Sequence, residues 1–223
     1  MKQSESEANI SRPRKPERAN GKERYALLCE TAAAIVMEEG AASLTIQRIA
    51  KQAAVPMASV YHFFPSPTAA LVAVAQTYLD EFTAAVERST AFAADRPWQD
   101  TVADLMSQVV SYYNQQPSAA RLLLGSDTNW QIRQADFSNA EILVKLLCES
   151  LSLHFAPASQ VDLADTFRIA MAIADGIWAL SVALEGGVSD HYAREALKAT
   201  TAYIDARLGS PQSPSTRACR PGN

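Results

Sequence analysis

The chain has 223 residues, of which 48% are apolar and 20% are charged, the balance of an ordinary globular protein. This length is enough to bury a substantial core, and no apolar run approaches the roughly 18 uncharged residues that span a bilayer. The polar N-terminal segment does not have the pattern of a secretory signal. Cys29, Cys148 and Cys219 stand at long spacings, which exclude a disulfide framework or a CxxC metal site and fit a reducing compartment. The composition therefore predicts a cytoplasmic protein with no membrane partner.

The net charge of −4 hides an asymmetry along the chain. Residues 1–65 carry nine Lys or Arg against seven Asp or Glu, whereas residues 66–208 carry nine against seventeen. A basic N-terminal end indicates a polyanionic partner, although a solvated tail would have the same composition. Residues 1–19 hold two prolines and few apolar side chains, and they are predicted to be a disordered basic arm. The Ser-, Pro- and Arg-containing segment 209–223 is predicted to be a disordered tail.

Helical patterns fill the chain between these ends. Apolar residues recur at three- and four-residue steps, and Gly or Pro separates one run from the next. Gly40 is expected to end the first helix, while Thr45 and Ser66 are placed as N-caps. No segment has the alternation of a strand followed by a hairpin turn. The sequence predicts an all-α protein of about nine helices, near residues 20–39, 46–53, 57–64, 67–94, 97–114, 118–124, 128–155, 160–185 and 189–208.

The segment 45–64 reads TIQRIAKQAAVPMASVYHFF and has the form of two short helices joined by a tight turn. Such a pair cannot bury its own apolar face, so the helices before and after it must close a small core. This is the helix-turn-helix arrangement, in which the second helix presents its outer face to the major groove of DNA. A three-helix DNA-binding head is therefore predicted over residues 20–80, followed by a larger helical domain over 81–208.

The candidate DNA-binding residues are those that face outward on these two helices. Small side chains of the second helix allow close approach to base edges, and its Tyr and His can donate to phosphate oxygens. The start of the first helix offers backbone amides and polar side chains to a phosphate. Each of these assignments has a purely structural alternative. Tyr61 could pack on the next helix, His62 could be an ordinary surface residue, and Gln47 and Arg48 could simply be solvated residues at a helix start. The set is Thr45, Gln47, Arg48, Met57, Ala58, Ser59, Tyr61 and His62.

At these residues the chain resembles a known family. The stretch 44–71 closely resembles the DNA-binding domain of TetR-family transcriptional regulators. The matching residues are Thr45, Ile49, Ala50, Ala53, Val55, Ser59, Val60, Tyr61, Phe64, Ser66 and Leu71. The resemblance implies a homodimeric, all-α repressor that binds double-stranded operator DNA and is released by a small-molecule effector, without a cofactor or metal.

Three positions depart from the family pattern. Ala54 stands where relatives have a turn glycine, so a left-handed backbone there would be strained. Pro56 replaces a serine N-cap, and Pro67-Thr68 replaces a Lys-Glu pair whose lysine contacts phosphate in relatives. These departures keep open an alternative, a helical ligand-binding or scaffolding protein whose head no longer binds DNA.

The C-terminal domain is expected to hold the effector and the dimer interface. Aromatic and Met side chains with a few polar residues suit an amphipathic pocket, although most of them could be plain core. The candidate pocket residues are Met106, Tyr112, Trp130, Phe137 and Asp175. Stripes on helices 160–185 and 189–208 predict a four-helix interface between two copies, with the alternative that they pack within one chain. Its candidate residues are Met171, Trp178, Ala199 and Tyr203.

Enzymatic functions find no support in the sequence. None of the GxSxG, GxGxxG, P-loop or HExxH motifs is present. His62, His154 and His191 are widely separated, and no pair has metal-ligand spacing. The sequence therefore predicts a DNA-binding regulator rather than an enzyme.

Overall fold

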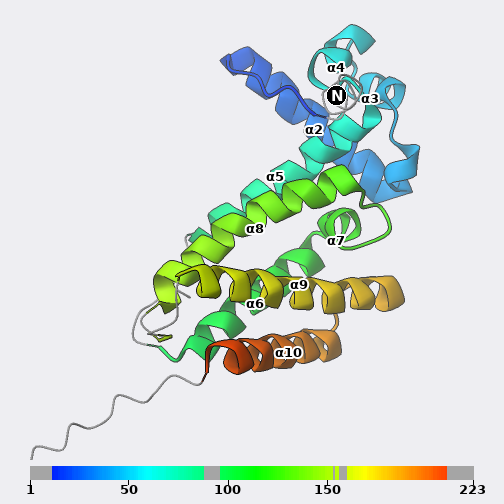
Figure 1. The fold of residues 1–223 in the computed structure, drawn as a ribbon. Coiled ribbons are helices and arrows are strands. Elements are labelled where there is room, and N and C mark those ends of the chain that lie inside the picture. Colours follow the sequence, from blue (N-terminus) through cyan, green and yellow to red (C-terminus); the bar gives the residue numbers. More distant parts are fainter. Residues whose placement is uncertain (1–11, 88–95, 153, 156–159, 210–223) are drawn as a thin grey trace, which may run out of the picture.

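The computed structural model describes residues 12–87, 96–152, 154–155 and 160–209, and throughout these ranges the regular elements are helices (Figure 1). The predicted all-α class is confirmed. Within the described ranges the elements are α2 (Ala19–Glu39), the short 3-10 helix η1 (Ala41–Ser43), α3 (Ile46–Gln52), α4 (Met57–Phe63), α5 (Pro67–Glu87), α6 (Trp98–Gln115), α7 (Pro117–Leu123), α8 (Trp130–Leu151), α9 (Gln160–Glu185) and α10 (Asp190–Leu208). The fourth predicted helix, expected to reach residue 94, extends to Glu87, and residues 88–95 lie outside the described part.

Helices α2, α3 and α4 form a small head at one end of the molecule (Figure 1). Leu28, Ile35, Ile49, Val60 and Phe64 are almost completely buried and make its core. The ring of Tyr25 packs edge-on against Phe63 and Phe64, with centroids 5.8 and 5.4 Å away. The two short helices α3 and α4 thus depend on α2 and on the first turns of α5 for their stability.

Helix α5 runs from the head into the larger helical body (Figure 1). Helix α8 lies along it, and the buried Thr83 hydroxyl donates to Asn139 Oδ1 at 3.1 Å, which joins the two helices. Helices α9 and α10 form an antiparallel pair on the side of the body away from α5. The Asn114 side chain holds the turn between them through two hydrogen bonds to Val188, of 2.8 and 3.0 Å.

A polar contact joins the body to the head. The Asp127 carboxylate, between α7 and α8, accepts from Arg121 Nη2 at 3.0 Å and from the backbone N–H of Ala41 at 3.2 Å. Gly40 makes this approach possible, because it adopts φ +85° and a Cβ there would lie 3.0 Å from Arg121 Nη2. The end of α2 is therefore tied directly to the body.

Residues 12–18, which belong to the arm predicted to be disordered, make contacts with the head and with α5. The N–H of Arg14 donates to the carbonyl of Phe63 at 2.8 Å, and Lys15 Nζ lies 3.6 Å from Asp80. The last carbonyls of a helix have no partner within the helix, so the end of α4 offers acceptors to a passing strand of chain. Residues 12–18 thus lie beside α4, and residues 1–11 and 210–223 lie outside the described part.

Helix α9 is the most apolar described helix. Its segment Asp162–Glu185 is long enough to cross a membrane, and the most apolar 18-residue window in it has a mean hydropathy of 1.6, yet only 33% of that window is buried. It packs on α8 and α10 within the body, so its composition is that of a core helix with a second, uncovered apolar side.

Candidate DNA-binding surface and ligand cavity

The outer face of α4 is available for contact with a partner. Tyr61 is 45% exposed and Met57 is 46% exposed, while Ala58 and His62 are exposed and Ser59 is half-buried. The inward residues of the same helix, Val60 and Phe63, are buried in the head core. The predicted division of α4 into an outward and an inward face is therefore confirmed, whereas the DNA contacts themselves stay a prediction.

The first helix of the motif is capped as expected. Thr45 Oγ1 accepts from the backbone N–H of Arg48 at 3.2 Å, which fixes the start of α3. Gln47 is exposed and Arg48 is half-buried at this helix start. The N-cap bond uses the Thr45 oxygen only as an acceptor, so a contact between the proton of this hydroxyl and a phosphate stays a prediction.

The turn between α3 and α4 is strained by an alanine. Ala54 adopts φ +53°, and its neighbours complete a Schellman motif, with Val55 N–H bonded to Ala50 O at 3.0 Å and Ala54 N–H bonded to Lys51 O at 3.3 Å. This position normally favours glycine, because a Cβ is unfavourable in the left-handed region. Pro56 then begins α4 without any side-chain cap.

Replacing Ala54 with Gly is expected to stabilise the head by about 0.5–1 kcal/mol. The gain is the relief of the left-handed strain, of about 1–2 kcal/mol, reduced by the greater entropy of glycine in the unfolded chain. Urea denaturation measures it. The control is Ala58→Gly, which removes the same methyl group from an exposed position inside α4 and is expected to destabilise by about 0.5–1 kcal/mol. Equal destabilisation by both changes would contradict the strain.

The guanidinium of Arg48 is already paired within the head. It makes a two-pronged ion pair with Glu39, in which Nη1 donates to Oε2 at 2.7 Å and Nη2 donates to Oε1. Nη1 also approaches the carbonyl of Ser43 at 3.3 Å, and the pairing lowers the pKa of Glu39. The predicted contact of Arg48 with a phosphate would therefore have to compete with Glu39, a partner that the sequence pattern did not reveal.

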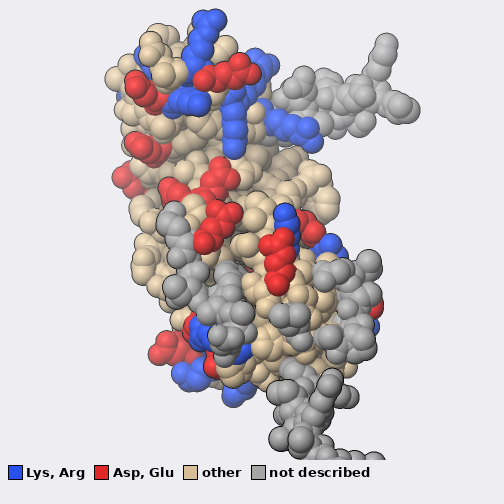
Figure 2. Space-filling view, turned by 90° about the vertical axis from the view of Figure 1, so that its left-hand side faces the viewer, with Lys and Arg blue, Asp and Glu red and all other residues tan. Residues whose placement is uncertain are grey.

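Positive charge gathers at the head end of the molecule. Figure 2 shows Lys and Arg clustered at the end formed by the head, with a few acids among them, whereas Asp and Glu dominate the middle of this face. The described residues 12–24 hold six exposed Lys or Arg side chains, and Lys51 of α3 is exposed as well. The charge asymmetry along the sequence thus corresponds to an uneven charge distribution in the structure, in which the basic end is the one that carries the helix-turn-helix.

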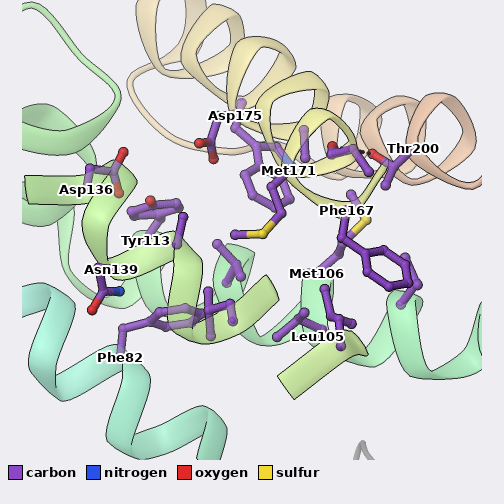
Figure 3. A pocket seen from close by; sticks show the side chains of 18 of the residues that line it. Phe82, Leu105, Met106, Tyr113, Asp136, Asn139, Phe167, Met171, Asp175 and Thr200 are labelled. Atoms are coloured by element: carbon purple, nitrogen blue, oxygen red, sulfur yellow. Dashed lines mark hydrogen bonds between the residues drawn. The ribbon is translucent and has the colours of Figure 1, made fainter. Parts of the chain in front are cut away.

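A second candidate site is a narrow apolar cavity inside the body. Side chains from α5, α6, α8, α9 and α10 line it, among them Phe82, Leu105, Met106, Phe167 and Met171 (Figure 3). Its envelope is about 750 Å³, which includes space open to solvent, but only about 80 Å³ of this admits the centre of a water molecule. A ligand larger than a few atoms must therefore displace side chains, which flexible methionines in the wall permit.

Polar groups gather toward one end of this cavity. Asp136 and Asn139 of α8, Tyr113 of α6 and Asp175 of α9 lie there (Figure 3). Desolvation by burial, with the charge of Asp136 nearby, raises the pKa of Asp175 to about 7. Burial also raises the pKa of Asp136, although Arg133 Nη1 stands 3.2 Å from its carboxylate and opposes the shift.

Two of the five predicted pocket residues line this cavity, namely Met106 and Asp175. Trp130 and Phe137 do not, because they are 69% and 52% exposed on the outer side of α8. Tyr112 lies outside the lining as well, where its hydroxyl donates to the carbonyl of Tyr78 at 2.9 Å. These three residues are corrected: a high aromatic content did not indicate which side of a helix faces inward.

The predicted interface residues also divide between two environments. Trp178 is only 3% exposed and lies against Tyr113 in the cavity wall, and Met171 lines the same cavity. Both therefore face the interior of their own chain, which corrects their placement at an interface. Ala199 and Tyr203 are half-buried on α10 and stay candidates. The outward apolar side of α9 is instead formed by Ile169, Leu180 and Leu184.

A helix-turn-helix head, joined by one long helix to an all-helical body with an internal cavity, is the architecture of a ligand-responsive transcriptional regulator. Comparison with protein families agrees with this class. Residues 28–74 match the model for bacterial regulatory proteins of the tetR family, and residues 96–208 match that for the tetracyclin repressor-like C-terminal domain. The chain belongs to the TetR family of transcriptional regulators, which are DNA-binding proteins and not enzymes.

Solved structures of similar fold include two that carry the same family name. A TetR-family transcriptional regulator from Streptomyces coelicolor is 22% identical with a TM-score of 0.67, and the alignment covers 83% of this chain and 99% of that one. A TetR transcriptional regulator from Rhodococcus sp. RHA1 is 18% identical with a TM-score of 0.61, with 81% and 95% covered. The multidrug binding protein EbrR, solved with imidazole, is 22% identical with a TM-score of 0.55, with 83% and 95% covered. No curated protein sequence matches the chain.

Proposed function

We propose that this protein is a cytoplasmic, homodimeric repressor that binds a specific double-stranded DNA operator and is released from it by a small molecule in the cavity. The observation that carries the proposal is the outer face of α4, where Tyr61 and Met57 are exposed above fully buried Val60 and Phe64. A rigid short helix with slim and hydrogen-bonding side chains on its free face suits the major groove, which is about 12 Å wide. In this arrangement Tyr61 and His62 donate to phosphate oxygens, and Met57, Ala58 and Ser59 approach base edges.

A path for effector release runs from the cavity to the head. Asn139 lines the cavity and accepts the hydrogen bond of Thr83 on α5, the helix that continues from α4. The Arg121–Asp127 pair, just before α8, holds the backbone of Ala41 beside α2. A ligand that shifts α8 can therefore change the angle of the head through both contacts, and two heads must keep a fixed spacing of about 34 Å to bind one operator.

The direct test is binding of the full chain to DNA from the region upstream of its own gene and of the adjacent genes. Replacing Tyr61 with Phe is expected to weaken binding about 5- to 30-fold, because it removes a hydrogen bond of about 0.5–1 kcal/mol from each of two heads. The slope of affinity against salt should not change, because no charge is removed. Gel shift or fluorescence anisotropy measures both quantities.

The matched control for this test is Tyr192→Phe, the same change on α10 in the body, for which no loss is expected. Equal affinities of the Tyr61→Phe and parent chains would remove α4 as the docking face. Absence of binding to any of these DNA fragments and to a random-sequence pool would favour the alternative, a helical ligand-binding or scaffolding protein. The strained turn at Ala54 and the neutralised Arg48 are the observations that motivate that alternative.

A further inference from the structure

The polar end of the cavity has an excess of negative charge. Asp136 and Asp175 are contributed by two helices of the cavity wall, and none of the described lining residues is Lys, Arg or His. Arg133, which is not part of the lining, pairs with Asp136 at 3.2 Å. The second carboxylate, that of Asp175, is without a partner, because it makes no hydrogen bond or ion pair within the described part of the chain. When Asp175 is ionised, the three groups together carry one uncompensated negative charge.

A second observation at the same place indicates a missing partner. Tyr113 is 93% buried, and its hydroxyl makes no hydrogen bond within the described residues although the ring lines the cavity. This hydroxyl is therefore available to a ligand or to water in the cavity. The rings of Tyr113 and Trp178 pack at 6.4 Å between centroids, and they form an aromatic wall beside Asp175. Aromatic faces attract cations, and they do so more strongly where water is excluded.

From this arrangement we infer that the ligand of the cavity is a lipophilic monocation: an apolar body of modest size that bears one amine or quaternary ammonium group, placed between Asp175 and the aromatic wall. The inference rests on the proposed function, because it names the chemical class of the effector expected in the same cavity. Phe82, Leu105, Met106 and Phe167 surround the apolar body, and the ammonium group supplies the positive charge that the polar end lacks.

Other ligand classes fit this cavity less well. An anion would place a third negative charge near Asp136 and Asp175 without a cation in the lining to compensate it. A neutral alcohol could accept from Asn139 or bond to Tyr113. Above neutral pH, however, it would leave Asp175 as an unpaired carboxylate in an apolar wall, which is costly. A cation removes this cost, and the narrow space of the cavity limits the size of its apolar body.

Protonation should be coupled to binding. Besides Asp175, the titratable or charged groups at this end are Asp136 and Arg133 of α8 and Tyr113 of α6. The pKa of Asp175 is near 7, so its charged form becomes dominant only above neutral pH. A bound cation favours that charged form, and binding of a quaternary ammonium is therefore expected to tighten as pH rises from 6 to 8 and to release protons.

The test compares three probes with the same eight-carbon body: octyltrimethylammonium, 1-octanol and octanoate. Isothermal titration calorimetry of the full chain at pH 8 is expected to show the cation binding at least tenfold more tightly than the alcohol, with octanoate weakest. Asp175→Asn should bring the cation and the alcohol within threefold of each other. The control Asp165→Asn removes the same charge from the exposed side of α9, 3.8 Å from Arg207, and should keep the tenfold preference.

A second variant keeps the test decisive if Asp175→Asn does not fold. Asp136→Asn leaves Asp175 to be balanced by Arg133, so it should also abolish the preference for the cation. The inference is overturned if octanol or octanoate binds as tightly as the cation, if both variants keep the preference, or if no probe binds. DNA binding measured on the same preparation separates the two proposals. If only octanoate releases the chain from DNA, the chain is a regulator but its ligand is not a cation. If the cation binds the chain but the chain does not bind DNA, the ligand class is supported and the regulator is contradicted.

Discussion

Replacing Leu180 with Glu is expected to convert a dimer into a monomer and to weaken operator binding by at least 100-fold. Leu180 is 49% exposed and Leu184 is 65% exposed on the side of α9 that faces away from the cavity. Gly176 lies on the same side one turn earlier, and a Cβ there would meet nothing within 4 Å. The backbone of a second helix can therefore approach closely at this point and cover the two leucines.

The expected loss of affinity follows from the geometry of two linked heads. A dimer binds its second half-site as an intramolecular event, which strengthens binding by about 100- to 10,000-fold over a single head. A buried glutamate opposite its own copy removes this linkage, because two like charges would be desolvated together at the two-fold axis. Sedimentation equilibrium separates the 24.1 kDa monomer from a particle of twice that mass.

The chain offers a matched control in Ile142→Glu. Ile142 is similarly exposed, at 41%, but lies on α8 outside the proposed interface. This variant should stay dimeric and bind DNA as the parent does. A parent chain that sediments as a monomer at micromolar concentration would contradict the dimer, and a dimeric Leu180→Glu chain would move the interface away from this side of α9. Ala199 and Tyr203 of α10 are the expected neighbours of Leu180 in that interface.

The DNA-binding head was accessible to sequence reasoning because its restraints are local. A seven-residue helix has only one way to bury Val60 and Phe63, and the other side is then free for Tyr61 and His62. The left-handed turn at Ala54 follows from the same local pattern, since the chain must reverse between two short helices. The spacing of the apolar residues and the position of the turn therefore predicted both short helices, α3 and α4, and the residues on their outward faces.

Helix α9 shows where this reasoning fails. The helix is apolar on nearly every side, so the three- and four-residue steps fit two opposite stripes equally well. One stripe, through Met171 and Trp178, lines the cavity, and the other, through Leu180 and Leu184, is exposed. The distinguishing signal was Asp175, which lies on the first stripe. A charged residue among apolar ones marks the side that faces the polar end of the cavity, and not a helix-to-helix interface.

The sequence pattern did not predict the contacts between parts of the chain that are far apart in the sequence. Asp127 meets Ala41 across 86 positions, and Asn139 meets Thr83 across 56. The pairing of Arg48 with Glu39 spans only nine positions, but it depends on the tight turn of η1 between them. Such contacts are set by tertiary packing, and they are the ones that connect the ligand cavity with the head.

Replacing Asp175 with Asn is expected to stabilise the protein by about 2–4 kcal/mol at pH 8. The pKa of Asp175 is about 7 in the folded protein, against a model-peptide value of 3.8. Between these two values the unfolded chain binds fewer protons than the folded one, so this carboxyl makes the parent less stable as pH rises, by up to about 1.4 kcal/mol per pH unit. Well above the folded pKa the parent has lost the full free energy that the pKa difference represents. Contact of the carboxylate with water in the cavity reduces this loss, which is why the lower bound of the expected stabilisation is about 2 kcal/mol.

Because Asn has the same shape and does not titrate, the difference between variant and parent should grow from pH 5 to pH 7 and level off toward pH 8. Urea denaturation at pH 5, 6, 7 and 8, at one protein concentration, measures this difference. Asp165→Asn on the exposed side of α9 should change stability by less than about 0.5 kcal/mol at every pH. A difference for Asp175→Asn that does not depend on pH would mean that the carboxyl stays ionised and well solvated in the free protein. The stabilisation and the loss of cation binding should therefore occur in the same variant, because both arise from one carboxylate that the cavity wall desolvates without a partner.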